Sequence, residues 1–287
     1  MELRVIGEEN RPPVLFMPGS DWDEKLSSAA LRALRNDYCL LIPDAEEEAD
    51  PAALEEALLR DTAGALWGAY GLNDGAEALL TLLNRDALDI RTRVVEGRFS
   101  LPDDTPGSGR EIRCWTGYKD KKGKQSLEAL RADGWQAAAL TLKKLPKEKS
   151  TMAYCPSLAT KQLKKAFGTA QCVSRTAVLP AGPERVLALL GEKPDAREAA
   201  RLDRAAPVHC DEKKRTVLYE GSGAGLPVWY HLIRLEAVDD RHTRCTDRIY
   251  FRSSGKDGPV TEKSVRRHLL RLHILRLLAL LGWRYAL

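Results

Sequence analysis

Histidine is missing from residues 1–208 of this 287-residue chain, and all five histidines follow that point. A reaction that needs imidazole as its general base has none to use in the first 208 residues. Long apolar runs are missing too. The longest, Leu269 to Leu281, is interrupted by two arginines and a histidine, so it is too short and too charged to span a bilayer. No basic segment followed by an apolar run opens the sequence, so we expect no signal peptide.

Closely spaced cysteine pairs are also absent, because the six cysteines are spread along the whole chain: Cys39, Cys114, Cys155, Cys172, Cys210 and Cys245. In a chain of this length, that distribution favours reduced, mostly buried thiols and a cytoplasmic location. The pairs His209-Cys210 and His242-x-x-Cys245 do not have the spacing of a known zinc site. We therefore expect neither a metal nor another cofactor.

The formal net charge of +4 conceals an uneven distribution. Residues 1–109 carry 10 Lys+Arg and 22 Asp+Glu, a net charge of −12, whereas residues 110–169 reach +9 and residues 170–287 reach +7. This distribution has two interpretations. Either the acidic and basic regions attract each other and form a contact between the domains, or the basic region binds an acidic partner. The basic runs Lys119–Lys124 and Lys143–Lys149 contain no aromatic residues that could stack on bases, so we expect no nucleic-acid binding.

The first half alternates short apolar runs with helical patterns, which is typical of a parallel sheet covered by helices. The predicted extended segments are Val14–Met17, Tyr38–Ile42, Ala63–Tyr70, Ile90–Phe99, Ile112–Tyr118 and Trp135–Leu142. The predicted helices are Ser27–Arg35, Pro51–Leu59, Asp74–Leu83, Lys124–Asp133 and Ser157–Phe167, with Asp50 as a cap. A loop is expected at Leu101–Gly109. The pattern predicts an α/β, doubly wound, mostly parallel sheet.

From Gln171 the pattern changes, so we place a domain boundary at residues 168–171. A strand comes first and three extended segments follow later: Cys172–Leu179, Thr216–Glu220, Val228–Val238 and Thr243–Phe251. Helices are predicted at Pro183–Leu190, Asp195–Ala205 and Thr261–Leu281. This order predicts an α+β domain, residues 171–287, with an antiparallel sheet and a long C-terminal helix.

The segment Tyr70–Ala76 lies between a predicted strand and a predicted helix, as a nucleophile elbow does. It resembles the G-x-S-x-G motif of the α/β-hydrolase family, with glycines at 71 and 75 and Asn73 in the position of the nucleophile. An amide is not a useful nucleophile, so no acyl-enzyme can form there. In the alternative that we leave open, the two glycines end a strand and start a helix in another doubly wound fold.

The α/β-hydrolase resemblance extends over residues 1–168. It implies that Pro18–Asp21 is the oxyanion loop and that Asp120 is in the position of the catalytic acid. The expected histidine is missing, because the loop after the last strand reads KKLPKEK at residues 143–149. Ser20 or Tyr70 acting with Asp120 is the remaining hydrolytic alternative, and neither has a visible base. We therefore predict a domain that lacks a catalytic triad.

Residues 171–287 resemble the START-like, helix-grip superfamily, which includes the polyketide cyclases. The resemblance is carried by CVSRTAVLPAGPERV at Cys172–Val186 and by the terminal helix Lys263–Leu278. It implies an apolar pocket between sheet and helix, with these candidate ligand contacts: Trp229, Tyr230, His231, Asp247, Tyr250, His268 and His273. Strand alternation puts Trp229 and His231 on one face and Tyr230 on the other, without indicating which face is inward.

Four arginines line the leucine-rich stripe of the last helix: Arg266, Arg267, Arg271 and Arg276. Such a helix lies on an anionic membrane surface, docks in a partner's groove, or closes the pocket of its own domain. We expect the third arrangement, with the arginines facing water.

Taken together, these patterns favour a non-catalytic binding protein for an apolar small molecule. Two alternatives remain. One is an enzyme with displaced catalytic groups, hydrolytic through Ser20 and Asp120 or cyclase-like through His231 and Asp247. The other is a scaffold that binds acidic partners through the basic surface of residues 110–169.

Overall fold

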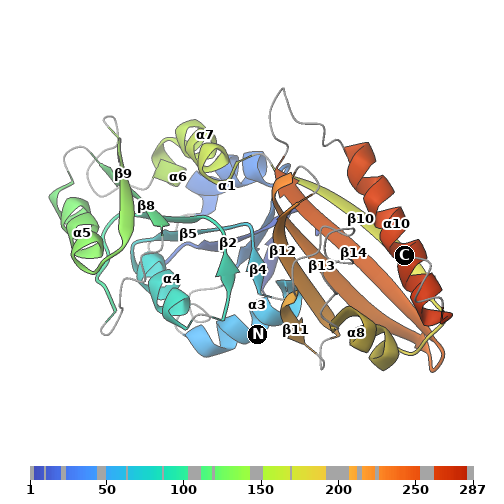
Figure 1. Cartoon of the computed structure of the whole chain (residues 1–287). Helices are drawn as coiled ribbons and strands as arrows, with labels where there is room; N and C mark the ends of the chain where they lie inside the picture. Colours follow the sequence, from blue (N-terminus) through green and yellow to red (C-terminus); the bar gives the residue numbers. More distant parts are fainter. Residues whose placement is uncertain are drawn as a thin grey trace. The chain divides into compact units, whose positions relative to one another are not determined.

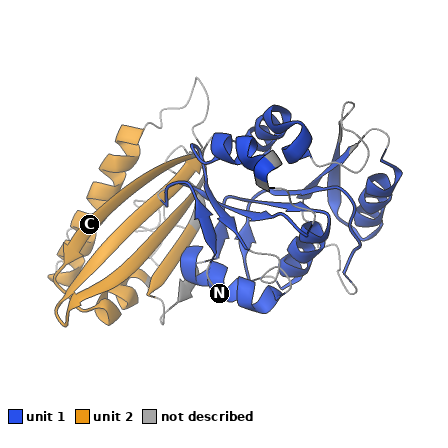
Figure 2. Ribbon diagram, turned by 180° about the vertical axis from the view of Figure 1, so that it is seen from behind, with its two compact units in different colours: residues 1–169 blue, residues 170–287 orange. Residues whose placement is uncertain are grey.

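The chain divides into two compact units, Met1–Thr169 and Ala170–Leu287 (Figure 2). The computed structural model describes residues 3–9, 11–20, 24–43, 50–62, 64–85, 87–102, 111–117, 120–142, 151–168, 170–191, 207–211, 215–223, 226–252 and 262–282. The predicted helix at residues 195–205, the basic loop at 143–149 and most of the predicted loop at 101–109 lie outside these residues.

The first unit is built on a seven-stranded sheet in the order β1-β3-β2-β5-β7-β8-β9. Its strands are β1 (Arg4–Ile6), β2 (Pro13–Met17), β3 (Cys39–Ile42), β5 (Gly68–Leu72), β7 (Arg93–Glu96), β8 (Glu111–Gly117) and β9 (Gln136–Leu142). All neighbouring pairs in it are parallel except β1 and β3. Strands β4 (Ala65–Leu66) and β6 (Asp89–Ile90) form a separate parallel pair. The predicted mostly parallel, doubly wound sheet is confirmed.

Helices cover both faces of this sheet (Figure 1). They are α1 (Glu24–Leu34), α3 (Pro51–Thr62), α4 (Asp74–Asn84), α5 (Lys121–Ala132), α6 (Thr151–Tyr154) and α7 (Pro156–Phe167). Apolar residues of α3, α4 and α5 share one core with β2 and β7, whereas α1, α6 and α7 contact one another. As predicted, Asp50 caps α3, because its Oδ1 accepts the N–H groups of Ala52 and Ala53.

The predicted strand Ala63–Tyr70 is two strands. The chain leaves the small sheet at Trp67, whose N–H donates to the carbonyl of Pro13, and β5 then continues through Gly71 to Leu72. The predicted extended segment Ile90–Phe99 likewise divides between the end of β6 and the four residues of β7. Strand β1 was not predicted, because three residues are too few to establish an alternating pattern.

The second unit holds a five-stranded antiparallel sheet in the order β10-β14-β13-β12-β11. The strands are β10 (Ala170–Leu179), β11 (Pro207–Asp211), β12 (Thr216–Gly223), β13 (Leu226–Asp239) and β14 (His242–Arg252). Among its described residues, the unit also contains helices α8 (Pro183–Gly191) and α10 (Glu262–Leu280) (Figure 1). The predicted antiparallel sheet with a long C-terminal helix is confirmed, and β11 is an additional strand.

Apolar residues of both helices and of one sheet face form the core of the second unit. They include Val173, Val186, Val217, Ile233, Leu235, Ile249, Phe251, Val265, Leu269 and Leu272. Because side chains alternate along a strand, the inward face of β13 also carries His231, and the inward face of β14 also carries Asp247. A charged carboxylate therefore faces an apolar core.

Candidate functional site

The turn between β5 and α4 is packed backbone against backbone, which explains both of its glycines. A Cβ at Gly75 would lie 2.2 Å from the carbonyl oxygen of Met17, and one at Gly71 would lie 2.7 Å from the Cα of Ala76. Neither distance leaves room for a methyl group. The predicted glycine spacing thus has a physical cause, the close approach of β2 and β5 to α4.

Asn73 sits at the tip of this turn in a conformation that side-chain-bearing residues rarely adopt, with φ 50° and ψ −116°. Its N–H donates to the carbonyl of Glu96 at 3.0 Å, and its Oδ1 accepts the N–H of Arg98 at 3.0 Å. Asn73 therefore has the strained position at the turn that is expected of a nucleophile, but it is half-buried and its amide oxygen holds the segment after β7 in place.

The loop after β2, predicted as the oxyanion loop, binds a carboxylate of the chain itself. The N–H of Ser20 donates to both carboxylate oxygens of Asp74, at 3.1 and 2.9 Å. Oδ1 of the same carboxylate lies 3.2 Å from the N–H of Gly75 in the first turn of α4. A backbone donor suited to a developing oxyanion already has an anion bound to it.

The other residues considered for hydrolysis have separate structural partners. Asp120 caps α5, accepting the N–H of Gly123 at 3.1 Å, and pairs with Nε of Arg98 at 3.4 Å. Tyr70 is fully buried and donates its hydroxyl to Glu96 at 2.6 Å. Burial, reinforced by the Glu96 carboxylate, raises the pKa of Tyr70 well above its usual value.

Glu96 was not predicted as an important residue, but it is buried in the first unit, at 2% exposure. Thr151 donates to its Oε1 through both the backbone N–H and the hydroxyl, at 2.5 and 2.6 Å. Burial raises the pKa of Glu96 despite the hydrogen bonds from Thr151 and Tyr70. Through Tyr70 and Thr151, this carboxyl joins β5, β7 and α6, which is a structural role.

Replacing Asn73 by serine is expected to leave the chain without esterase activity. The new hydroxyl would have the right position on the turn, but residues 1–208 offer no histidine to deprotonate it, and Ser20 N–H stays bound to Asp74. Hydrolysis of p-nitrophenyl acetate by Asn73→Ser, compared with the unaltered chain, measures this. A serine-dependent rate that a fluorophosphonate abolishes would show that the triad is not needed.

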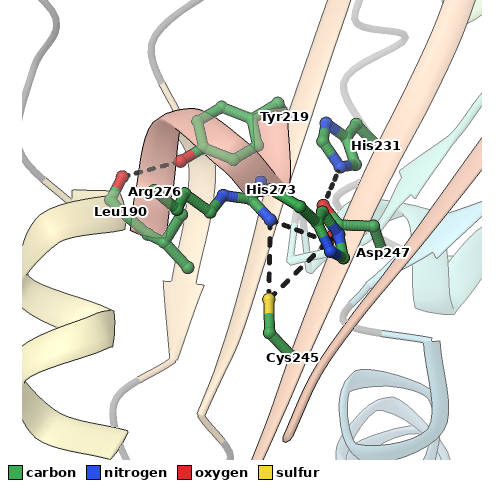
Figure 3. A network of polar contacts seen from close by, with 7 residues as sticks. All are labelled: Leu190, Tyr219, His231, Cys245, Asp247, His273 and Arg276. Atoms are coloured by element: carbon green, nitrogen blue, oxygen red, sulfur yellow. Dashed lines mark hydrogen bonds and ion pairs between the residues drawn. The ribbon is translucent and has the colours of Figure 1, made fainter. Parts of the chain in front are cut away.

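A second candidate site lies in the second unit, around Asp247 on β14 (Figure 3). This aspartate is completely buried, with 0% of its surface exposed. Its Oδ1 lies 2.5 Å from Nε2 of His231 on β13, and its Oδ2 lies 2.5 Å from Nε2 of His273 on α10. Nη1 of Arg276, also on α10, donates to Oδ2 at 2.7 Å. Three cationic or polar groups from a strand and a helix thus meet on one carboxylate.

Electrostatics inside this cluster favour the ionised carboxylate. Burial alone would raise the pKa of Asp247, but Arg276 and the hydrogen bonds from both histidines hold it well below its usual value. Asp247 in turn raises the pKa of Arg276, against the effect of burial. Because an ionised carboxylate only accepts hydrogen bonds, Nε2 of each imidazole must carry the proton, and Nδ1 of a neutral ring is then an acceptor.

Cys245 and Tyr219 border the cluster. The thiol of Cys245 lies 3.6 Å from Oδ2 of Asp247, and burial, helped by that carboxylate, raises its pKa to about 12. It is therefore a neutral packing group and not a nucleophile. The ring of Tyr219 lies 5.8 Å from that of His231, and its hydroxyl donates to the carbonyl of Leu190 at 2.6 Å (Figure 3).

Three polar atoms of the cluster are buried and have no hydrogen-bond partner among the described residues. They are Nδ1 of His273 and both Nε and Nη2 of Arg276. The two side chains belong to residues that are only 7% and 4% exposed, so bulk water does not solvate them freely. Buried groups of this kind are normally satisfied, which makes this cluster the candidate binding site of the second unit.

Three of the seven predicted ligand contacts meet at this cluster: His231, Asp247 and His273. Tyr230 and Tyr250 lie directly across from each other on β13 and β14, and both are buried on the sheet face opposite to the one that carries Asp247. His268 is half-buried on α10, and the side chain of Trp229 lies outside the described residues. The expectation that the arginines of the last helix face water is wrong for Arg276, because position 276 continues the inward stripe of α10.

The basic region of the first unit lines a groove of about 680 Å³ beside the edge strand β9. Arg113 on β8, Arg131 at the end of α5 and Lys165 on α7 border it, together with Trp115. These cations are where an acidic partner would bind in the scaffold hypothesis, which stays a prediction.

Comparisons with known proteins concern the fold. No protein-family model and no curated protein matches this chain. An α/β hydrolase family protein from Desulfitobacterium hafniense is 14% identical, with a TM-score of 0.48 over 58% of this chain and 100% of that chain. The Bacillus cereus carboxylesterase is 14% identical, with a TM-score of 0.41 over 57% and 94%. A START superfamily protein from Mycobacterium smegmatis is 12% identical, with a TM-score of 0.30 over 38% and 98%. The solved structures similar to this chain thus include both of the fold classes that its sequence resembles.

Proposed function

We propose that the second unit binds a small organic molecule at the Asp247 cluster, and that the first unit carries out no serine-hydrolase chemistry. One observation supports the binding role most directly: three polar atoms of His273 and Arg276 are buried beside an apolar core and have no partner among the described residues. A ligand with oxygen atoms at one end would satisfy them.

A purely structural role accounts poorly for Arg276. In the ion pair with Asp247 it uses Nη1, whereas a bidentate pair would also use Nε or Nη2. Each buried donor without a partner costs about 1–3 kcal/mol, and buried ion pairs are often no more stable than apolar side chains of similar volume. A buried arginine that lowers stability by this much is more readily explained by ligand binding than by a purely structural role.

The cluster also indicates the chemistry of the ligand. The free N–H groups of Arg276 suit a carboxylate or carbonyl oxygen, and Nδ1 of a neutral His273 suits a hydroxyl group. Val217, Ile249 and Leu269 of the surrounding core suit an apolar body. An ionised carboxylate beside two imidazoles is also suited to proton transfer, so the ligand is a candidate substrate as well as a candidate cargo.

The probe for this site is 8-anilinonaphthalene-1-sulfonate, an apolar dye with an anionic end. We expect saturable fluorescence enhancement with about one dye per chain. Arg276→Gln should weaken binding about tenfold or more, because it removes the charged donors. Arg241→Gln is the matched control, since Arg241 is an exposed arginine of the same unit, in the turn between β13 and β14, and the variant should bind the dye like the unaltered chain.

Circular dichroism melting of each variant separates lost binding from lost folding. If Arg276→Gln melts like Arg241→Gln and binds the dye equally well, the cluster does not bind the anion and the proposal fails. If Arg276→Gln does not fold, His273→Gln, which keeps a donor toward Asp247, replaces it under the same criteria.

A further inference from the structure

The outward face of α10 carries a second apolar stripe that its own core does not use. Leu270, Ile274, Leu277 and Leu281 are 41%, 48%, 38% and 59% exposed. Their spacing of four, three and four residues places them on one side of the helix. They are half of the large hydrophobic residues that are exposed in the described chain, so the stripe is a concentrated patch and not a scatter of single residues.

This outer stripe is distinct from the stripe that packs against the sheet. The inward positions are Val265, Leu269, Leu272, His273, Arg276 and Leu280, all buried. With a rotation of about 100° per residue, the centres of the two stripes lie about 120° apart around the helix. Packing of α10 against the sheet therefore accounts for its inward apolar stripe, whereas the outer stripe is left exposed to water.

Cations adjoin the outer stripe. Lys263, Arg266 and Arg267 are exposed in the first two turns, and Arg271 is exposed beside Leu270. The acidic residue of the helix, Glu262, pairs with Arg266 at 2.6 Å. Along its outward side, α10 is thus basic at its start and apolar over its remaining turns.

We propose that α10 docks on an anionic membrane surface, lying in the plane of the interface with Leu270, Ile274, Leu277 and Leu281 inserted and the cations at the lipid headgroups. No helix within the described residues is long and apolar enough to cross a membrane. In sequence, Trp283 and Tyr285 follow the helix, and such side chains are enriched at membrane interfaces.

The charges argue against a second copy of α10 as the occupant. A parallel pair would bring the cations at 263–271 of both helices together, and like charges repel. An antiparallel pair would place the arginines of one helix on the leucines of the other. An anionic surface above a hydrocarbon layer matches both parts of the face at once. This inference does not depend on ligand binding by the second unit.

The test is co-sedimentation of the full chain with vesicles. We expect binding to phosphatidylcholine vesicles that contain about 30% phosphatidylserine, at least about tenfold weaker binding to phosphatidylcholine alone, and release by about 0.5 M NaCl. The triple variant Leu270→Ser, Ile274→Ser and Leu277→Ser should lose most binding. The control variant Val178→Ser and Val238→Ser, two exposed apolar residues elsewhere in the same unit, should keep it.

Three outcomes would overturn the proposal. Equal binding to both vesicle types would show that the cations do not contribute to binding. Equal binding by the triple variant and its control would show that the apolar stripe does not contribute. A dimer of the unaltered chain that the triple variant converts to monomer, without vesicle binding, would assign the stripe to self-association. Because the substituted residues are exposed, we expect the triple variant to melt as the unaltered chain does, and Arg267→Glu with Arg271→Glu provides a second variant with the same expected loss.

Discussion

Asp247→Ala is expected to lower the free energy of unfolding of the second unit by about 3–5 kcal/mol. The substitution removes the partner of Arg276 and leaves its positive charge buried, at 4% exposure, with no compensating anion among the described residues of the cluster. It also removes the acceptor of two imidazole N–H groups. Urea denaturation followed by circular dichroism measures the loss, because the affected unit should unfold at a lower urea concentration.

The double variant Asp247→Ala with Arg276→Met is the matched control. It removes both charges and fills part of the space with an apolar chain of similar length, so it should recover at least half of the loss. A single variant that costs less than about 1 kcal/mol, or a double variant as unstable as the single one, would show that the ion pair is not the dominant interaction of the cluster.

Gly75→Ala is expected to destabilise the first unit by about 3 kcal/mol or more. The added methyl group would lie 2.2 Å from the carbonyl oxygen of Met17 and 2.8 Å from the backbone nitrogen of Gly19, and such backbone atoms cannot rotate away as the end of a side chain does. Either α4 moves off the sheet or the loop after β2 shifts, and the second change would also break the contact between Ser20 and Asp74. Thermal and urea unfolding of the variant measure the effect.

Ala78→Gly, one turn further along α4, is the comparison. This substitution removes a methyl group, whereas Gly75→Ala adds one. Position 78 is half-buried, and helix propensity alone predicts that the free energy of unfolding falls by about 1 kcal/mol. Equal losses for the two variants would mean that the contact between α4 and β2 is looser than the distances indicate.

Periodicity carried most of the fold prediction. The uninterrupted apolar runs of β2 and β3 indicated strands buried on both faces, the alternation in β13 and β14 indicated strands with one buried face, and Asp50 was identified as a cap from its residue type and position. The three residues of β1 were missed and the two of β4 were merged with β5, because both strands form their pairs through tertiary contacts, which no local pattern encodes.

The candidate site was predictable only in part. His231, Asp247 and His273 were among the seven contacts that the helix-grip resemblance implied, but the alternation along β13 did not show which face is inward. Arg276 was assigned to water, since a long cationic side chain is usually solvated, and only the positions of its helical neighbours show that it points inward. In the first unit, the turn at Asn73 followed from the glycine spacing, but the bond between Asp74 and Ser20 depends on a loop conformation.

The most direct test of ligand binding by the second unit is a crystal structure of the full chain, purified without added ligand or soaked with an apolar carboxylate. The decisive region surrounds Nε and Nη2 of Arg276 and Nδ1 of His273. We expect electron density for an organic molecule with an oxygen atom within about 3.2 Å of at least one of these atoms. Protein groups or a single ordered water in that place, in both crystals, would contradict it.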